Sequence, residues 1–169
     1  MNELTETVYV IRLEEIFWGG TLLATTMAIH GLGMLMVLRV AGDLNRRFAS
    51  KPSFVKGLFT LVLASWLIMV VHLLEVCPWA AFFRVVGAVN AAPGNASVAF
   101  YVALSDYTTL GCEFTLVTHW RLLQGMIAVA GLMTFAWSTG VLLTLAQAFQ
   151  DQQLKLLRER RARRKSSAE

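Results

Sequence analysis

Three long stretches of the chain contain no charged side chain. They are residues 16–38, 57–74 and 122–150, and their only titratable groups are His30 and His72. A bilayer core of about 30 Å needs roughly 20 helical residues, so each stretch is of the length that spans it. A soluble helical bundle would place a polar face on every helix, and these stretches have almost none. The pattern therefore predicts an all-α membrane protein with three transmembrane helices.

A fourth apolar run, residues 98–107, is much shorter. Ten helical residues rise only about 15 Å, which is half of a bilayer core. The segment NAAPGNAS at 90–97 is rich in turn formers, and Asn95 or Ser97 is the expected N-cap of a short helix. We expect this helix to enter the membrane between the second and third spans without crossing it.

The composition agrees with a membrane protein. Hydrophobic residues make up 56% of the 169 residues and charged residues 15%, against the usual quarter. The first 15 residues carry four glutamates and one arginine, which is the wrong charge for a cleavable signal peptide. Two cysteines, Cys77 and Cys112, are too few for a disulfide framework.

The basic residues predict the orientation. Of the 15 lysines and arginines, all but Arg12, Arg84 and Arg121 lie in the loop after the first span or in the C-terminal tail. Positive loops stay cytoplasmic, so we expect the N-terminus outside and the C-terminus inside. The basic tail has two readings, an anionic-lipid site or a stop-transfer anchor with a solvated helix.

The segment SDYTTLGCEF at 105–114 carries the candidate chemistry. Non-helical backbone at membrane depth survives where protein covers it or where it lines a water-filled path. Threonine offers a hydroxyl and a carbonyl to a bare cation, and glycine lets the backbone turn its carbonyls inward. The C-terminal dipole of the short helix would also favour a cation. These features indicate a cation path.

At these residues the chain resembles the potassium-channel superfamily. The run AFYVALSDYTTLG looks like its pore helix and the start of its selectivity filter. The motifs IHGLG (29–33), HLLEVCPWA (72–80) and HWRLLQGMIAVAGLMTFAWSTG (119–140) are similar to small bacterial three-span, two-pore-domain-like channels of that superfamily. The resemblance covers roughly residues 16–148. It implies a homotetramer in a bacterial cytoplasmic membrane and potassium as the permeant ion.

The resemblance also implies a segmentation of the chain. Residues 1–15 form an extracytoplasmic segment, 16–40 a peripheral span, 41–56 a basic cytoplasmic loop and 150–169 a basic cytoplasmic tail. The pore module is 57–149. Within it, 57–77 is the outer helix, 98–107 the pore helix, 108–113 the filter and 120–149 the inner helix.

The filter departs from the superfamily pattern. The family sequence is close to Thr-Thr-Leu-Gly-Tyr-Gly-Asp, whereas this chain has Thr108, Thr109, Leu110, Gly111, Cys112 and Glu113. Read without a gap, Cys112 replaces the tyrosine and Glu113 the second glycine. Read with a one-residue deletion, Glu113 replaces the aspartate. In both registers the inner filter residues are present and the outer ones are altered, so we expect weakened potassium selectivity or poor conduction.

Further residues have candidate roles that the resemblance suggests. Gly131, Phe135, Trp137 and Gly140 are candidates for gating or pore lining, and for Gly131 and Trp137 the alternative is close helix packing. His72 and Glu75 are three residues apart and share a helix face, where Asp106 or Tyr107 would be their partners in bracing the filter. His30 is expected to be a packed or hydrogen-bonded histidine; the alternative is a ligand, in a cluster with His72 and Glu75 that the sequence alone does not show.

Three functions stay open at this point. The first is a passive cation channel. The second is a non-conducting or regulatory relative. The third is a metal-binding membrane protein that uses Cys112 and Glu113, with His72 and Glu75; thiols suit soft metals such as copper or zinc. A Cys77–Cys112 disulfide is a further alternative. We find no enzyme motif, expect no cofactor besides the permeant cation, and expect no nucleic-acid partner.

Overall fold

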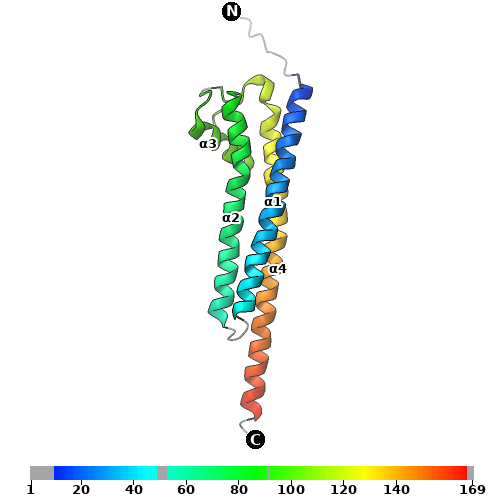
Figure 1. The fold of residues 1–169 in the computed structure, drawn as a ribbon, viewed down its shortest axis with the longest axis vertical. Helices are drawn as coiled ribbons and strands as arrows, with labels where there is room; N and C mark the ends of the chain where they lie inside the picture. The colour runs from blue at the N-terminus through cyan, green and yellow to red at the C-terminus, as the bar shows by residue number, and fades with distance from the viewer. Residues whose placement is uncertain (1–9, 49–52, 91, 167–169) are drawn as a thin grey trace, which may run out of the picture. The chain divides into compact units, whose positions relative to one another are not determined.

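The computed structural model describes residues 10–48, 53–90 and 92–166. It is all-α, with three long apolar helices and a short helix between the second and the third, as the sequence predicted. The long helices are α1 (Leu13–Phe48), α2 (Phe54–Val85) and α4 (Leu122–Ser166). The short helix α3 spans Ala96–Tyr107, and a 3₁₀ turn, Thr118–Trp120, leads into α4 (Figure 1).

The long helices have the character of membrane spans. Each contains an apolar window long enough to cross a bilayer, and only 28%, 22% and 28% of the residues in these windows are buried. So much exposed apolar surface requires lipid or protein to cover it. The chain is therefore a multi-pass membrane protein by helix length and composition. Helix α4 continues through the basic residues of the tail to Ser166. Parts of the predicted N-terminal segment, basic loop and tail (1–9, 49–52 and 167–169) lie outside the described residues.

The chain divides into two compact units. The first contains the residues up to His30 together with His72–Phe135, and the second contains Gly31–Val71 with the residues from Ala136 onward. The core of the second unit is aliphatic, and consists of Met34, Val37, Ala64, Ile68, Val71 and Val141.

The core of the first unit is larger and holds α3. One face of α3 is buried, with Ala99, Val102 and Ala103 at helical spacing. Trp79 and Phe83 of α2 are fully buried in the same core. The indole of Trp79 donates a hydrogen bond to the Thr26 hydroxyl at 2.8 Å, so the polar edge of the ring is satisfied inside the core.

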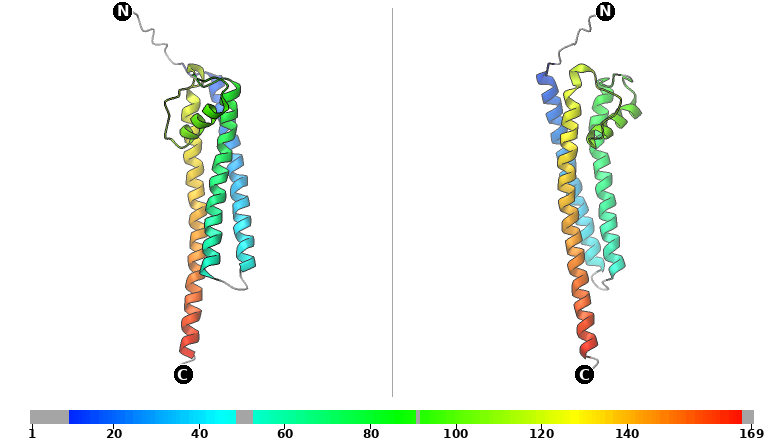
Figure 2. Two further views of the ribbon diagram at one scale, coloured as in Figure 1. Left: turned by 90° about the vertical axis from the view of Figure 1, so that its left-hand side faces the viewer. Right: turned by 180° about the vertical axis from the view of Figure 1, so that it is seen from behind.

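Helix α2 ends in a motif that turns the chain toward α3. Gly87 has φ +60°, and its N–H bonds the carbonyl of Arg84, while the N–H of Ala88 bonds the carbonyl of Phe83. This pair of bonds is a Schellman motif, in which glycine is preferred at the left-handed position. Val89 then pairs in antiparallel fashion with Leu116 beyond α3, so both connections to α3 are tied together. Figure 2 shows α3 and its connections, in green, from two further sides.

Helix α3 starts at a capped end. The Asn95 side-chain oxygen accepts hydrogen bonds from the backbone N–H groups of Ser97 and Val98. Of the two N-cap candidates in the sequence, the cap is therefore Asn95.

Candidate functional site

The loop that follows α3 has an unusual backbone. Thr109 has φ +60°, its N–H bonds the Asp106 carbonyl, and the N–H of Leu110 bonds the Ser105 carbonyl at 2.9 Å. Helix α3 thus ends in a Schellman motif of its own, with threonine in the position where glycine is preferred.

This conformation strains Thr109. A β-branched residue with positive φ is a genuine outlier, and a left-handed conformation costs an L-residue about 1–2 kcal/mol. Gly111, two residues later, also has positive φ at +70°. Local strain of this kind persists where the surrounding structure determines it, and it gathers at functional sites.

The loop is exposed in the described chain. Residues 108–111 are all exposed, and Leu110 is 79% exposed although it is apolar. The Thr108 hydroxyl is turned back to the carbonyls of Leu104 and Ser105. The loop is therefore anchored to α3 on one side and exposed on the other.

Cys112 and Glu113 continue this loop. Glu113 is exposed, and the Cys112 thiol is half-buried and donates to the Phe114 carbonyl at 3.4 Å. Burial raises the pKa of the Cys112 thiol, and the neighbouring carboxylates of Asp106 and Glu113 raise it further. The hydrogen bond to the Phe114 carbonyl opposes this rise. Cys77 and Cys112 are both free cysteines, so the disulfide alternative is wrong.

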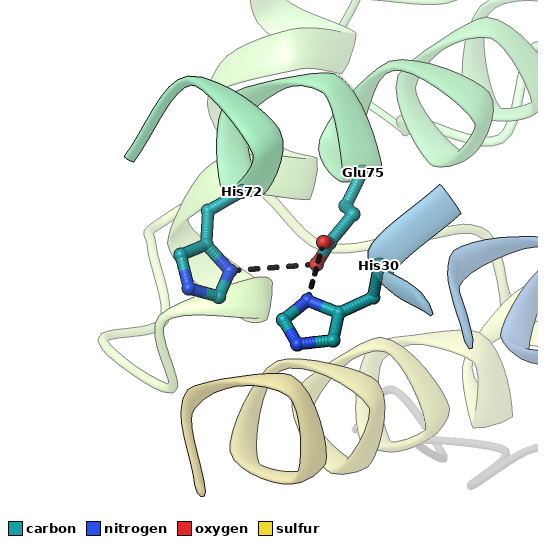
Figure 3. A group of neighbouring side chains, drawn as sticks. All are labelled: His30, His72 and Glu75. Carbon is teal, nitrogen blue, oxygen red and sulfur yellow. Dashed lines mark hydrogen bonds and ion pairs between the residues drawn. The ribbon is translucent and has the colours of Figure 1, made fainter. Parts of the chain in front are cut away.

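Behind the loop lies a buried polar cluster of α1 and α2 side chains. The Glu75 carboxylate is fully buried; its Oε1 lies 2.8 Å from Nδ1 of His30, and its Oε2 lies 3.4 Å from Nδ1 of His72. Figure 3 shows both rings turned toward this carboxylate, His72 from the same helix and His30 from the neighbouring one. The sequence placed His72 and Glu75 on one helix face. The structure adds His30 to this pair.

Tyr107, the last residue of α3, joins the cluster to the loop. Its buried hydroxyl donates to Oε2 of Glu75, lies 2.8 Å from Nδ1 of His72 and lies 2.6 Å from the hydroxyl of Thr134 on α4. The next residue along the chain begins the strained loop. The cluster therefore contacts the residue directly before the loop, and of the two partners expected for His72 and Glu75, Tyr107 is the one that they bind.

One assignment of protons accounts for the hydrogen bonds around Glu75. The phenol of Tyr107 donates to Glu75 and accepts from Nδ1 of His72, and His30 donates through its own Nδ1. The single hydroxyl hydrogen of Thr134 is shared between the Tyr107 hydroxyl and the Gly131 carbonyl. In this assignment Glu75 carries a full negative charge and receives only donors. Hydrogen bonds stabilise a buried carboxylate of this kind. A nearby positive charge would stabilise it further, because the carboxylate has lost its hydration.

Asp106 takes a different partner. Its carboxylate is buried and accepts a hydrogen bond from the Gln124 amide of α4 at 3.1 Å. Burial raises the pKa of Asp106, and the bond from Gln124 opposes this rise. Asp106 therefore ties α3 to α4 and does not share in the contacts between Tyr107 and Glu75.

Gly131 of α4 lies directly against Tyr107. A Cβ at Gly131 would come within 1.9 Å of the Tyr107 carbonyl oxygen, so glycine is required for this approach. The structure therefore gives Gly131 the packing role, and α4 is one uninterrupted helix through this position. Phe135 packs on the rings of His72 and Tyr107, at centroid distances of 4.5 and 5.5 Å.

The remaining pore-lining candidates belong to the second unit. Trp137 is half-exposed and lies 3.7 Å from the position of a Cβ on Gly31, and Gly140 has open space around its Cα. Neither takes part in the bracing cluster.

Sequence reasoning missed two residues of this region. Thr134 belongs to no sequence motif, and a single threonine in an apolar span does not show which residue it will bond. Glu15 is fully buried, and accepts from the backbone N–H of Arg12 and, at 3.1 Å, from that of Leu122. It therefore caps the N-termini of α1 and α4 together. Its place three residues after Arg12 and directly before the first predicted span was the available signal, because a glutamate there can reach back to the backbone at the start of a helix.

Comparison with family models, with curated proteins and with solved structures finds no match to this chain. The three long apolar helices make it a small multi-span membrane protein, and they assign it to no family.

Proposed function

We propose that this chain is the subunit of a passive cation channel, in which copies of the loop 108–113 surround the path of the ion. The observation that carries the proposal is the form of α3 and its loop. The helix has 12 residues, about 18 Å, too short to cross a bilayer, and it ends in a strained, exposed turn of oxygen-bearing residues.

The bracing behind the loop supports the same function. A ring of backbone and hydroxyl oxygens selects ions only when its positions are held. Tyr107 is fixed from α1, α2 and α4 through Glu75, His30, His72 and Thr134. This leaves the exposed face of Thr109 and Gly111 as the part that meets the ion.

One copy of the loop cannot enclose an ion, so the proposal includes a homotetramer. The exposed Leu110 and the apolar surfaces of the long helices are the surfaces that other copies and lipid would cover. We further propose a bacterial cytoplasmic membrane with the N-terminus outside, because the basic residues follow that orientation. The basic tail would lie at the anionic lipid surface.

The outer end of the loop bears on selectivity. Cys112 and Glu113 stand where the potassium-channel pattern has other residues, and four exposed Glu113 carboxylates would form a ring that attracts cations, divalent ones included. Potassium is the proposed permeant ion, with a weak preference over sodium.

The test is thallium and potassium flux into liposomes that contain the purified protein. Flux is expected to exceed that of empty liposomes. Thr109→Ala is expected to reduce it, because each chain then loses one of the hydroxyl groups proposed to surround the ion. Thr115→Ala, at an exposed threonine beyond the loop, is the matched control and is expected to conduct like the parent. Flux equal to that of empty liposomes would refute the proposal and leave a non-conducting relative.

Selectivity is tested separately by reversal potentials in bilayers with potassium on one side and sodium on the other. A potassium preference of about a hundredfold or more would contradict the reading of the altered outer filter. Glu113→Gln is expected to weaken block by divalent cations without abolishing potassium flux.

A further inference from the structure

The cluster behind the loop contains a set of groups that metal ions bind. His30, His72 and Glu75 each offer one ligand atom, and these atoms all lie within 4.8 Å of one another. Two imidazole nitrogens and one carboxylate oxygen are a ligand set found for zinc in proteins. Figure 3 shows the three side chains converging from two helices on one small volume.

We propose that His30, His72 and Glu75 bind one divalent transition-metal ion, with zinc as the best-fitting ion. This inference does not depend on ion conduction, and it is tested by metal binding alone.

The distances fit a tetrahedral site after a small adjustment. Zinc bonds of about 2.0–2.1 Å place tetrahedral ligand atoms about 3.3–3.5 Å apart. His72 Nδ1 and Glu75 Oε2 already lie 3.4 Å apart. His30 Nδ1 lies 2.8 Å from the other carboxylate oxygen, Oε1, so the carboxylate must turn until one of its oxygens faces both rings. The three ligand atoms already lie within 4.8 Å of one another, and each ring must carry its proton on the other nitrogen.

Charge favours occupation of the site. The Glu75 carboxylate is fully buried and its ion pairs are with the two histidines. Buried charges are usually paired or coordinate a metal, because an isolated ion loses its hydration. A divalent cation bound to this carboxylate would offset its buried negative charge.

The surroundings provide an outer shell. Tyr107 donates to the carboxylate of Glu75, and Thr134 bonds the hydroxyl of Tyr107 at 2.6 Å. Such outer partners orient metal ligands and raise affinity. The rings of Phe135 and His72 are tilted against each other with centroids 4.5 Å apart, and the His72 side chain is 11% exposed while His30 and Glu75 are fully buried. An ion would therefore reach the site past His72.

The ligand types select against other ions. Magnesium and calcium require mostly oxygen ligands in larger number, and neither is suited to two imidazoles. The three ligands include no thiolate, so the set does not favour copper(I).

The experiment measures zinc binding to purified full-length protein without a polyhistidine tag, in detergent and without any ion gradient. Chelator-treated protein is titrated calorimetrically with zinc, and bound metal is counted by elemental analysis. One zinc per chain is expected, with no binding of magnesium at the same concentration. His30→Gln and His72→Gln are expected to weaken binding more than about 100-fold, since even an outer-shell change costs 10–100-fold.

His119→Gln is the matched control, because His119 is the chain's third histidine, is exposed and lies outside the cluster. Near-parental affinity is expected there. Thermal melts without metal show whether each variant is folded, and zinc should raise the melting temperature of the parent and of His119→Gln only. Absence of stoichiometric zinc on the parent, or equal affinity in His30→Gln and the parent, overturns the proposal. Because the measurement needs no pore, its failure would be distinguishable from a failure of the flux test.

Discussion

The strained residue at the end of α3 leads to a prediction with an unusual sign. Thr109 has φ +60° and Thr108, one residue before it, has φ −84°. At ordinary positions alanine is favoured over glycine by about 0.5–1 kcal/mol, because glycine loses more freedom on folding. At a left-handed position the order reverses, because the Cβ of an L-residue clashes with the backbone there. We expect the glycine variant to have a free energy of unfolding about 1 kcal/mol higher than that of the alanine variant.

The assay compares four variants by their melting temperatures in one detergent, followed by circular dichroism. For a chain of this size about 1 kcal/mol corresponds to 2–4 °C. Thr109→Gly is therefore expected to melt about 2–4 °C above Thr109→Ala. At Thr108 the alanine variant is expected to melt above the glycine variant, by up to about 4 °C. Because the Thr108 hydroxyl is lost in both variants, the comparison isolates the backbone.

The result that refutes the reasoning is the same order of glycine and alanine at both positions. If Thr109→Gly melts higher and conducts less than the parent, the strained threonine is retained for function at the expense of stability.

Three further predictions concern α3 and its contacts. Gly131→Ala would place a Cβ 1.9 Å from the Tyr107 carbonyl oxygen, so this oxygen must move by at least 1.1 Å to reach the 3.0 Å limit of real Cβ contacts, and the melting temperature should fall by about 2–12 °C. Gly125→Ala, where the added Cβ meets open space, should leave the melting temperature unchanged, and equal melting temperatures for the two variants would contradict the packing role. Tyr107→Phe leaves the buried Glu75 carboxylate without its hydroxyl donor and should lower the free energy of unfolding by about 1–3 kcal/mol. The control Tyr101→Phe, at an exposed tyrosine, should change it little, and similar melting temperatures for the two variants would show that the network contributes nothing to stability. Asn95→Ala should cost about 1 kcal/mol and speed hydrogen exchange in the first turn of α3, and Asn95→Ser should preserve the cap; unchanged exchange in Asn95→Ala would be inconsistent with capping.

The hydrophobic pattern alone was sufficient for the architecture. Three charge-free stretches of spanning length and one half-length run predicted the three long helices and the short helix. This worked because the bilayer requires an unbroken run of apolar residues, and such runs are visible without any knowledge of contacts. The turn formers before the short run likewise placed Asn95 among the cap candidates, since capping depends on residues close in sequence.

Helix boundaries were less predictable. The second stretch ends at residue 74 in the charge pattern, yet α2 continues past Glu75 and Pro78 to Val85. A glutamate looks like the end of an apolar run, but here partners from other helices satisfy it inside the protein. Only those partners, His30 and Tyr107, make the continuation understandable.

The sequence by itself determined that this protein has three apolar spans and a short helix with an oxygen-rich turn, because these properties depend on local composition and periodicity. Only the tertiary structure decided that His30, 45 positions before Glu75 in the chain, shares its carboxylate with Tyr107, and that Gly131 is pressed against the Tyr107 carbonyl. The physical reason is that a hydrogen bond or a steric contact depends on where two helices meet to within an ångström. An apolar stripe tolerates many such meetings, and the packed core of the first unit selects one of them.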